Sequence, residues 1–276
     1  MPHSALLLLA LVLLTGCTRR PADGLPPGVE VEDLPESESW DVRLRTSLNG
    51  ERSVEIEAPY LARYSSDSAY TYLGPPPGDS SAAPVSLRLF TDGEPSGSVR
   101  AREVWLYPGD RDEPDRLVAE GSVRATQADR AEVEAGRVVV VGERIEATGA
   151  VRAQVQSGGA SVRAPRVVVA EGGGFTASGG ASVQLTEAGA TVQARIVSGS
   201  GGRYTAQSGV RVVTRDGRTL TAERVVWDEG AQRFTAPGAF AVDGPRERVQ
   251  GVGLSATADL TRYSFRRATG QIEVSE

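Results

Sequence analysis

The residues that could do chemistry are few, and their positions exclude most reaction types. The 276-residue chain has one cysteine, Cys17, and one histidine, His3, and it has no lysine, so arginine supplies all of its positive side chains. The next observations place both single residues in or beside a leader peptide. A mature chain without histidine lacks a Ser-His-Asp triad, a Cys-His pair and a His-ligated zinc site. Without lysine it has neither a P-loop lysine nor a Schiff base.

One cluster of carboxylates could be imagined as a glycosidase acid pair or a calcium loop. It lies in YPGDRDEPDR and consists of Asp110, Asp112, Glu113 and Asp115. Arginines and prolines interrupt these acids, and the ligand spacing of an EF-hand is absent, so the segment is predicted to be a solvated loop. The glycines at 172–174 are predicted to form a turn, because no strand–GxGxxG–helix context surrounds them. We therefore expect no catalytic residue, no metal site and no cofactor, and we predict that the protein is not an enzyme.

The chemistry of Cys17 is predicted to be lipidation. Residues 5–14, ALLLLALVLL, are too few to span a bilayer but are typical of the apolar region of a signal peptide. The following Leu14-Thr15-Gly16-Cys17 resembles the lipobox of bacterial lipoproteins. These features predict a lipoprotein signal peptide at 1–16, a flexible tether at 17–39 and one domain at 40–276. Stable anchoring would need several acyl chains on Cys17, since one chain binds a membrane only marginally.

The sequence of the domain contains two short motifs that recur in alternation, and we call each motif a box. The first has an alanine before an apolar run, at Ala58, Ala101, Ala135, Ala164, Ala194 and Ala222. The second begins at Ile145, Phe175, Tyr204 and Phe234, at spacings of 30, 29 and 30 residues. A fixed period of this size is typical of repeat architectures.

Each box has the alternation of a half-buried strand, but the alternation is broken once in each unit. From Ala164 to Val167 the offset is odd, so both residues can face inward only if a bulge or corner lies between them. Pro165, or Gly136 in an earlier copy, fits such a corner. The pattern predicts an all-β fold, namely an elongated, repeat-built β-jellyroll of two stacked antiparallel sheets with open edges.

Three stretches resemble a known family. WDVRLRTSLNGERSVEIEAPYLARY (40–64), DGRTLTAERVVWDEGAQRFTAPGAFAV (216–242) and VQGVGLSATADLTRYSFRRATGQIEV (249–274) are similar to the OstA-type β-jellyroll of the lipopolysaccharide-export bridge, and especially to its membrane-anchored periplasmic family, LptC. The closing signature consists of Gly251, Gly253, Leu254, Ala256, Leu260 and Tyr263. Members of that family commonly carry an N-terminal transmembrane helix, whereas this chain has the lipobox-like segment.

The resemblance implies a periplasmic protein that binds lipopolysaccharide and passes it from the inner-membrane ABC transporter toward the outer membrane. The lipid anchor is expected in the inner membrane. A bridge protein of the same jellyroll family would pair edge to edge by β-augmentation. The expected partner edge consists of Tyr263, Phe265, Ile272 and Val274.

The acyl chains are expected in an apolar trough between the sheets. Its predicted inward residues are Val123, Val139, Val151, Val162, Val169, Phe175, Val183, Ile196, Tyr204, Val212, Val225, Trp227, Phe234 and Phe240. Any one of these residues taken alone is better explained as part of an ordinary sandwich core, so the expectation of a trough depends on the whole set.

Composition leaves two other function classes open. With 39% hydrophobic and 24% charged residues and a net charge of −6, the chain can bury a core but lacks the basic stripe that nucleic acid requires. No nucleic-acid partner is expected.

The first alternative function is that of a structural or adhesive lipoprotein whose β-stack is a stalk with a closed, fully packed core. The second is a β-helical carbohydrate-active enzyme, which the missing histidine and lysine disfavour.

Overall fold

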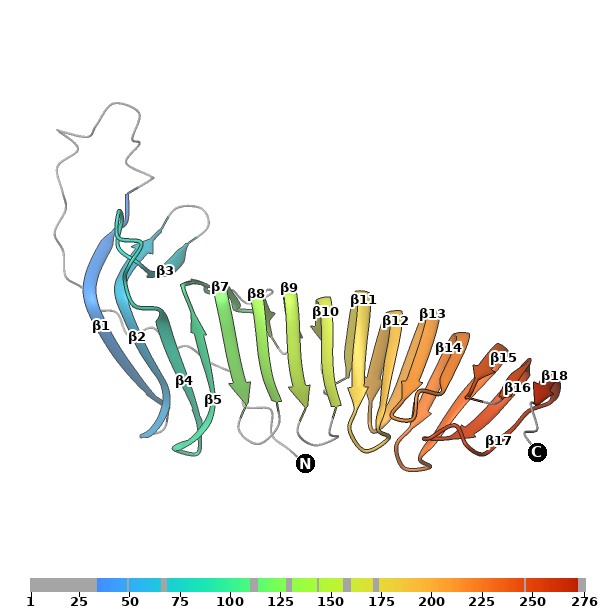
Figure 1. The fold of residues 1–276 in the computed structure, drawn as a ribbon. Helices are drawn as coiled ribbons and strands as arrows, with labels where there is room; N and C mark the ends of the chain where they lie inside the picture. Colours follow the sequence, from blue (N-terminus) through green and yellow to red (C-terminus); the bar gives the residue numbers. More distant parts are fainter. Residues whose placement is uncertain are drawn as a thin grey trace. The chain divides into compact units, whose positions relative to one another are not determined.

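The computed structural model describes residues 34–48, 50–65, 69–109, 114–127, 131–142, 144–155, 160–170, 174–245 and 247–272. Within these residues the chain forms 18 strands and no helix, which confirms the all-β prediction (Figure 1). Among them, therefore, no helix has the length and hydropathy of a membrane span. The predicted signal peptide and Cys17 lie outside the described residues.

The chain divides into two compact units. Unit 1 comprises residues 1–128 and 137–143, and unit 2 comprises residues 129–136 and 144–276. The strands are β1 (Ser37–Leu48), β2 (Glu51–Tyr64), β3 (Tyr70–Gly74), β4 (Val85–Thr91), β5 (Glu94–Ala101), β6 (Glu103–Tyr107), β7 (Arg116–Gln127), β8 (Ala131–Val141), β9 (Arg144–Val155), β10 (Ala160–Val169), β11 (Phe175–Leu185), β12 (Ala190–Ser200), β13 (Arg203–Thr214), β14 (Thr219–Asp228), β15 (Arg233–Asp243), β16 (Glu247–Thr257), β17 (Tyr263–Ser264) and β18 (Arg267–Ile272).

In unit 1 the long strands β2 and β7 each take part in two sheets. The first half of β2 pairs with β4 and its second half pairs with β3. The first half of β7 pairs with β6 and its second half with β5. All of these pairs are antiparallel, and the strand changes sheet in β7 at Gly121 and Ser122, which both have positive φ. The predicted pair of antiparallel sheets is confirmed.

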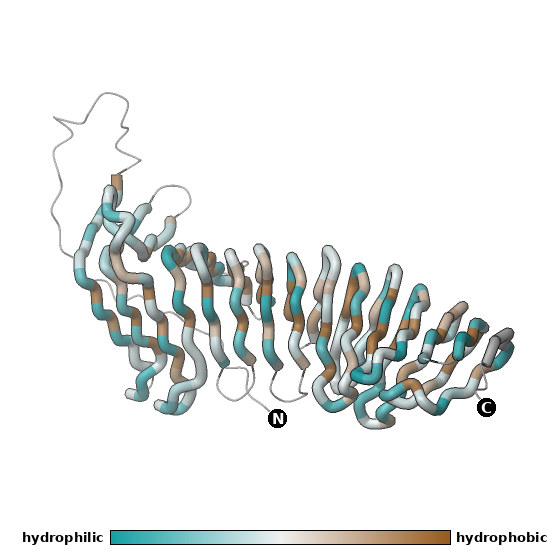
Figure 2. Tube along the Cα trace, in the orientation of Figure 1, coloured by the Kyte–Doolittle hydropathy of each residue, from teal (hydrophilic) through white to brown (hydrophobic). Residues whose placement is uncertain are grey.

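Unit 2 builds the same two layers from one strand after another. The strands β9 to β16 pair antiparallel with their neighbours in sequence, and from β10 onward each pair shows a register break near its middle. The break in β10 falls between Arg163 and Arg166, around Pro165, where the odd offset from Ala164 to Val167 predicted a corner. Figure 2 shows hydrophobic and hydrophilic residues alternating along these strands.

The two halves of each strand define the layers of unit 2. Layer A contains residues 160–163, 182–185, 190–193, 210–214, 219–222, 239–243 and 247–252. Layer B contains residues 166–169, 175–178, 196–200, 203–207, 225–228, 233–236 and 254–257. The side chains buried between the layers are mainly those of alanine, valine and leucine, with Trp227, Phe234 and Phe240, so the space between the layers is an apolar core.

The folded part begins before residue 40. The tether was predicted to reach residue 39, but β1 begins at Ser37, which pairs with Arg63. The Tyr60 hydroxyl donates to the Glu38 carboxylate at 2.6 Å, and this bond together with the ladder holds the start of β1 on β2. The last three residues of the predicted tether therefore belong to the folded part.

Candidate functional site

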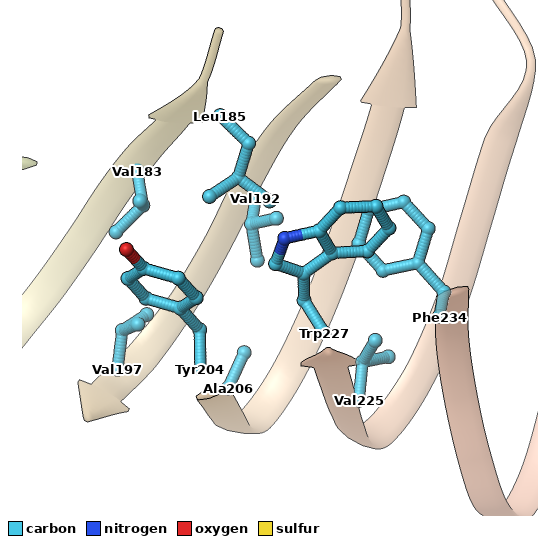
Figure 3. Close-up of a pocket in the computed structure, with 9 residues that line it drawn as sticks. All are labelled: Val183, Leu185, Val192, Val197, Tyr204, Ala206, Val225, Trp227 and Phe234. Carbon is cyan, nitrogen blue, oxygen red and sulfur yellow. The ribbon is translucent and has the colours of Figure 1, made fainter. Parts of the chain in front are cut away.

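An apolar slot lies between the two layers of unit 2 (Figure 3). It is lined by Val183, Leu185, Val192, Val197, Tyr204, Ala206, Val225, Trp227 and Phe234. All of these side chains except that of Tyr204 are buried. The cavity that remains among them is only about 10 Å³, which is about the size of one water molecule. The layers are therefore in contact, and the slot is closed in this conformation.

The corner determines which residues face the slot. Ala164 and Ala194 face inward before the corner, and the third residue after each, Val167 or Val197, faces inward again. Side chains alternate along a strand, so an offset of three keeps both residues inside only because the corner adds a residue. The same offset leads from Ala222 to the buried Val225.

Most of the predicted inward residues are buried. At 5% exposure or less are Val123, Val151, Val162, Val183, Val212, Val225, Trp227, Phe234 and Phe240. Val123 and Val139 belong to unit 1, so they are not part of the slot in unit 2. Val139, Val169, Phe175 and Tyr204 are half-buried.

The inward prediction for Ile196 is wrong. Ile196 is 37% exposed, whereas its neighbour Val197 is 1% exposed and lines the slot. The corner between Gln193 and Ile196 resets the alternation, so the residue that continues the apolar face is one position later. The prediction for Val139 is one position off in the same way, because the buried residue is Val138 and Val139 is half-buried.

Sequence reasoning also missed four lining residues, Leu185, Val192, Val197 and Ala206. The constant offset of three residues from the box alanine would have found Val197. The other three each lie two residues from an inward position on the same strand. Leu185 follows Val183, Val192 precedes the box alanine Ala194, and Ala206 follows Tyr204. Strict alternation along each strand would therefore have found them.

A lip of half-buried side chains flanks the slot on layer B. The rings of Phe175 and Tyr204 lie 6.2 Å apart, from β11 and β13. Between them, β12 carries Gly199, where a Cβ atom would overlap both rings. The glycine therefore lets the two rings lie against the backbone of the strand between them, and Val169 pairs directly with Phe175 on the other side.

Polar side chains connect the two layers at the turns after β11 and β14. The turn after β11 carries Glu187 and the turn after β14 carries Gln232, whose amide donates to the Glu187 carboxylate at 3.4 Å. The same amide donates to the Glu229 carbonyl at 3.0 Å. Burial, and secondarily the Glu187 carboxylate, raise the pKa of Glu229. We call this set, Glu187, Glu229 and Gln232, the first clasp.

A second clasp, Arg218, Glu247 and Tyr263, lies toward the C-terminal end. The Tyr263 hydroxyl donates to Glu247 Oε2 at 3.0 Å, which joins β17 to the start of β16. Glu247 also forms an ion pair with Arg218, and the Arg218 Nε lies 3.0 Å from Asp216 Oδ2. Burial and the hydrogen bond to Glu247 raise the pKa of Tyr263.

The predicted partner edge is not one strand. Tyr263 belongs to β17, which pairs with Ser255 and Ala256 of layer B, whereas β18 pairs with Glu247–Val252 of layer A. The chain changes layer at Phe265 and Arg266, alongside the corner of β16 at Gly253, so the predicted single alternation is interrupted there.

The aromatic residues of this edge have different surroundings. Tyr263 is half-buried, and Phe265 is 44% exposed with its ring 6.4 Å from that of Phe240. The backbone of Ile272 pairs with Glu247, while Val274 lies outside the described residues.

The carboxylate cluster is described only at its last member. Asp115 accepts a hydrogen bond from the Gly109 amide at 2.6 Å, whereas Asp110, Asp112 and Glu113 lie outside the described residues. Within the part of the chain that is described, no group of three or more histidine, cysteine, aspartate or glutamate side chains has the arrangement of a metal site.

No protein-family model matches the chain, and no curated protein matches it. Among solved structures it is similar to LptH, described as the LptA homologous periplasmic component of the conserved lipopolysaccharide transport device from Pseudomonas aeruginosa. The two chains share 15% identity with a TM-score of 0.22, and the match covers 64% of this chain and 95% of that chain.

Proposed function

We propose that this protein is a non-enzymatic carrier of lipid acyl chains, which enter between layers A and B of unit 2. The observation that carries the proposal is the apolar inner face that continues across β10–β16 and ends in the half-buried lip of Val169, Phe175 and Tyr204. A fully packed stalk has no need for apolar side chains at the opening between its layers. An acyl chain that enters there would meet aromatic rings first and the buried valines next.

Entry requires the layers to part, because the cavity is about 10 Å³. The energetic cost at the opening is modest. The first clasp joins the layers through a side-chain hydrogen bond, and the second through another, each contributing about 1 kcal/mol net. Each methylene that leaves water contributes about 0.8 kcal/mol, so a few inserted methylenes offset both clasps. Binding of this kind is firm but reversible, as a carrier needs.

The resemblance of residues 40–274 to the LptC and OstA-type family supports lipopolysaccharide as the lipid and the periplasm as the compartment. In that scheme Cys17 is acylated and holds the protein in the inner membrane. The transporter delivers lipopolysaccharide, and a bridge protein of the same jellyroll family receives it at β17 and β18. In the part of the chain that the structure describes, the pairing partner of both strands is β16, and their other backbone edge is the one that we propose for β-augmentation.

A structural stalk is the second candidate, and the small cavity favours it. A core that is closed at about 10 Å³ is what a stalk requires. The two functions differ in whether lipid ever reaches the slot.

Photocrosslinking from two neighbouring strands distinguishes the carrier from the stalk. A photoreactive phenylalanine at Tyr204 lies on the lip, while the same residue at Ile196 on β12 lies on the opposite face of layer B. With labelled lipopolysaccharide in living cells, the carrier predicts an adduct at Tyr204 and none at Ile196. Absence of an adduct at Tyr204 in a protein that is folded and correctly located would support the stalk.

A further inference from the structure

A row of aromatic rings crosses four strands of unit 1. Trp40 of β1 lies 5.6 Å from Tyr60 of β2, Tyr60 lies 6.2 Å from Tyr72 of β3, and Tyr72 lies 5.6 Å from Trp105 of β6, measured between ring centroids. The pairs are tilted, which is a favourable arrangement for aromatic rings.

A second row runs beside it. Tyr64 stacks on Tyr70 at 4.6 Å, and Tyr70 lies 5.7 Å from Tyr107. The guanidinium of Arg116 lies 4.1 Å from the Tyr107 ring, as in a cation–π contact. Together the two rows hold five of the seven tyrosines and two of the three tryptophans of the chain. We call this surface the aromatic face.

The aromatic face is not the core face of its sheet. Leu73, Val104 and Ala119 pair with one another across β3, β6 and β7 and are fully buried. Their neighbours in sequence, Tyr72 and Trp105, must point to the other side, because side chains alternate along a strand. This part of unit 1 therefore builds its core from aliphatic residues and carries most of the aromatic rings of the unit on the opposite face of the sheet.

Six of the seven rings on this surface are accessible, whereas Tyr60 is 2% exposed and its hydroxyl donates to the Glu38 carboxylate. Tyr64, Tyr70, Tyr72, Trp105 and Tyr107 are half-buried, and Trp40 is 60% exposed. Burial raises the pKa of Tyr64 and Tyr70, and it raises the pKa of Tyr72 to about 12, so these hydroxyls are neutral at physiological pH. An apolar ring with a neutral polar edge suits the headgroup region of a bilayer, where tryptophan and tyrosine are enriched.

The length of chain between Cys17 and Trp40 limits how far the aromatic face can lie from a membrane that holds Cys17. Trp40 lies three residues after the start of β1, and Cys17 precedes it by 23 residues. At about 3.5 Å per residue, an anchor at Cys17 keeps Trp40 within about 80 Å of the bilayer. We propose that the aromatic face of unit 1 docks on the headgroup region of the membrane that holds Cys17. The proposal rests on the anchor of the proposed function but not on the lipid slot.

Fluorescence quenching tests this docking. The chain from Cys17 onward contains every described residue, and its single cysteine can be coupled to a maleimide lipid in vesicles of phosphatidylethanolamine and phosphatidylglycerol. Coupling makes the test independent of acylation in the cell. The variant Trp105→Phe with Trp227→Phe retains Trp40, and the variant Trp40→Phe with Trp105→Phe retains Trp227. Lipids brominated near the headgroup should remove most of the Trp40 emission and leave the emission of Trp227, which is buried in unit 2, unchanged.

The quenching of Trp40 relative to that of Trp227 supports or overturns the proposed docking. Unquenched Trp40, or equal quenching of both variants, would overturn the proposal. A shift of Trp40 emission that depends on protein concentration and needs no vesicles would instead assign the face to a second copy of the chain. If Trp227→Phe lowers the melting temperature strongly, the wild-type chain is compared with Trp40→Phe/Trp105→Phe, and loss of both tryptophans of the face should then abolish the lipid-dependent part of the quenching. Failure here leaves the Tyr204 crosslink unaffected, so the two proposals fail separately.

Discussion

The two units place their aromatic residues on opposite faces of similar strands. In unit 2, Trp227 and Phe234 lie in the slot with their rings 4.5 Å apart. In unit 1, Trp105 lies on the aromatic face, away from the core. Trp227 follows the box alanine Ala222 by five residues, whereas Trp105 follows Ala101 by four.

That one-residue difference decides the environment of the side chain. Both boxes place an inward valine three residues after the alanine, Val225 in one and Val104 in the other. The next inward position is therefore the fifth and the next outward position is the fourth. A repeat of this kind can move a large ring from the core to the surface without changing its backbone.

The largest effect is expected for a charge in the apolar core of unit 2. Val212 is fully buried on the inner face of layer A, and its neighbour Val213 is half-buried on the other face. Val212→Arg should destabilise unit 2 by roughly 3–5 kcal/mol, because an unpaired guanidinium is costly in an apolar core. Val213→Arg is the matched control and should cost about 1 kcal/mol or less. Thermal melts of both variants compare them, and equal losses would show that the two faces are not different.

Loss of a ring should cost more inside unit 2 than on the aromatic face of unit 1. Phe234 is fully buried, so Phe234→Ala should cost about 3–5 kcal/mol through lost burial and a cavity. Tyr64→Ala removes a half-buried ring stacked on Tyr70 and should cost about 1 kcal/mol. Hydrogen exchange read unit by unit assigns each loss to its own unit and is therefore the measurement. A larger loss for Tyr64→Ala would place the aromatic face in a core.

Opening the first clasp should affect loading more than stability. Gln232→Ala removes the contact with Glu187 and should cost about 1 kcal/mol or less, because the pair is exposed. If the clasp holds the slot closed, the yield of the lipopolysaccharide adduct at Tyr204 should rise. Gln207→Ala, an exposed change on β13, is the control and should leave the yield unchanged. A fall in yield for Gln232→Ala would mean that the glutamine helps to bind the lipid.

The smallest effect is a pH dependence at the same clasp. Since the folded state raises the pKa of Glu229, the folded protein binds this proton more readily than the unfolded chain does. The contribution of Glu229 to stability therefore increases as the pH falls through its folded pKa and is complete below the unfolded value of about 4.3.

At neutral pH, Glu229→Gln should raise the melting temperature slightly, because it removes a charge that burial disfavours. The difference should disappear below about pH 4, where the wild-type carboxyl is protonated. Glu223→Gln, an exposed change on β14, makes the same change in net charge and should show no such convergence. A constant difference at every pH would contradict the role of burial at Glu229.

Much of the fold was determined by the sequence itself. The alternation within each box and the odd offset from Ala164 to Val167 predicted strands with a corner, and the register break around Pro165 confirms it. These features are local, because alternation and bulges depend on residues that are adjacent along one strand. For the same reason most inward valines, such as Val162 and Val183, were predicted correctly.

Only the tertiary structure decided what happens after each corner and between the layers. From the sequence, either Ile196 or Val197 could be the residue that faces inward after the corner. The pairing of β12 with its neighbours turns Val197 inward and leaves Ile196 exposed. The C-terminal alternation continues across residues 263–272 in sequence, but the corner of β16 divides it into β17 and β18. Glu187 and Gln232 are 45 residues apart and meet only because the two layers fold over each other. Such contacts depend on how strands are stacked in space, which no pattern along a single strand contains.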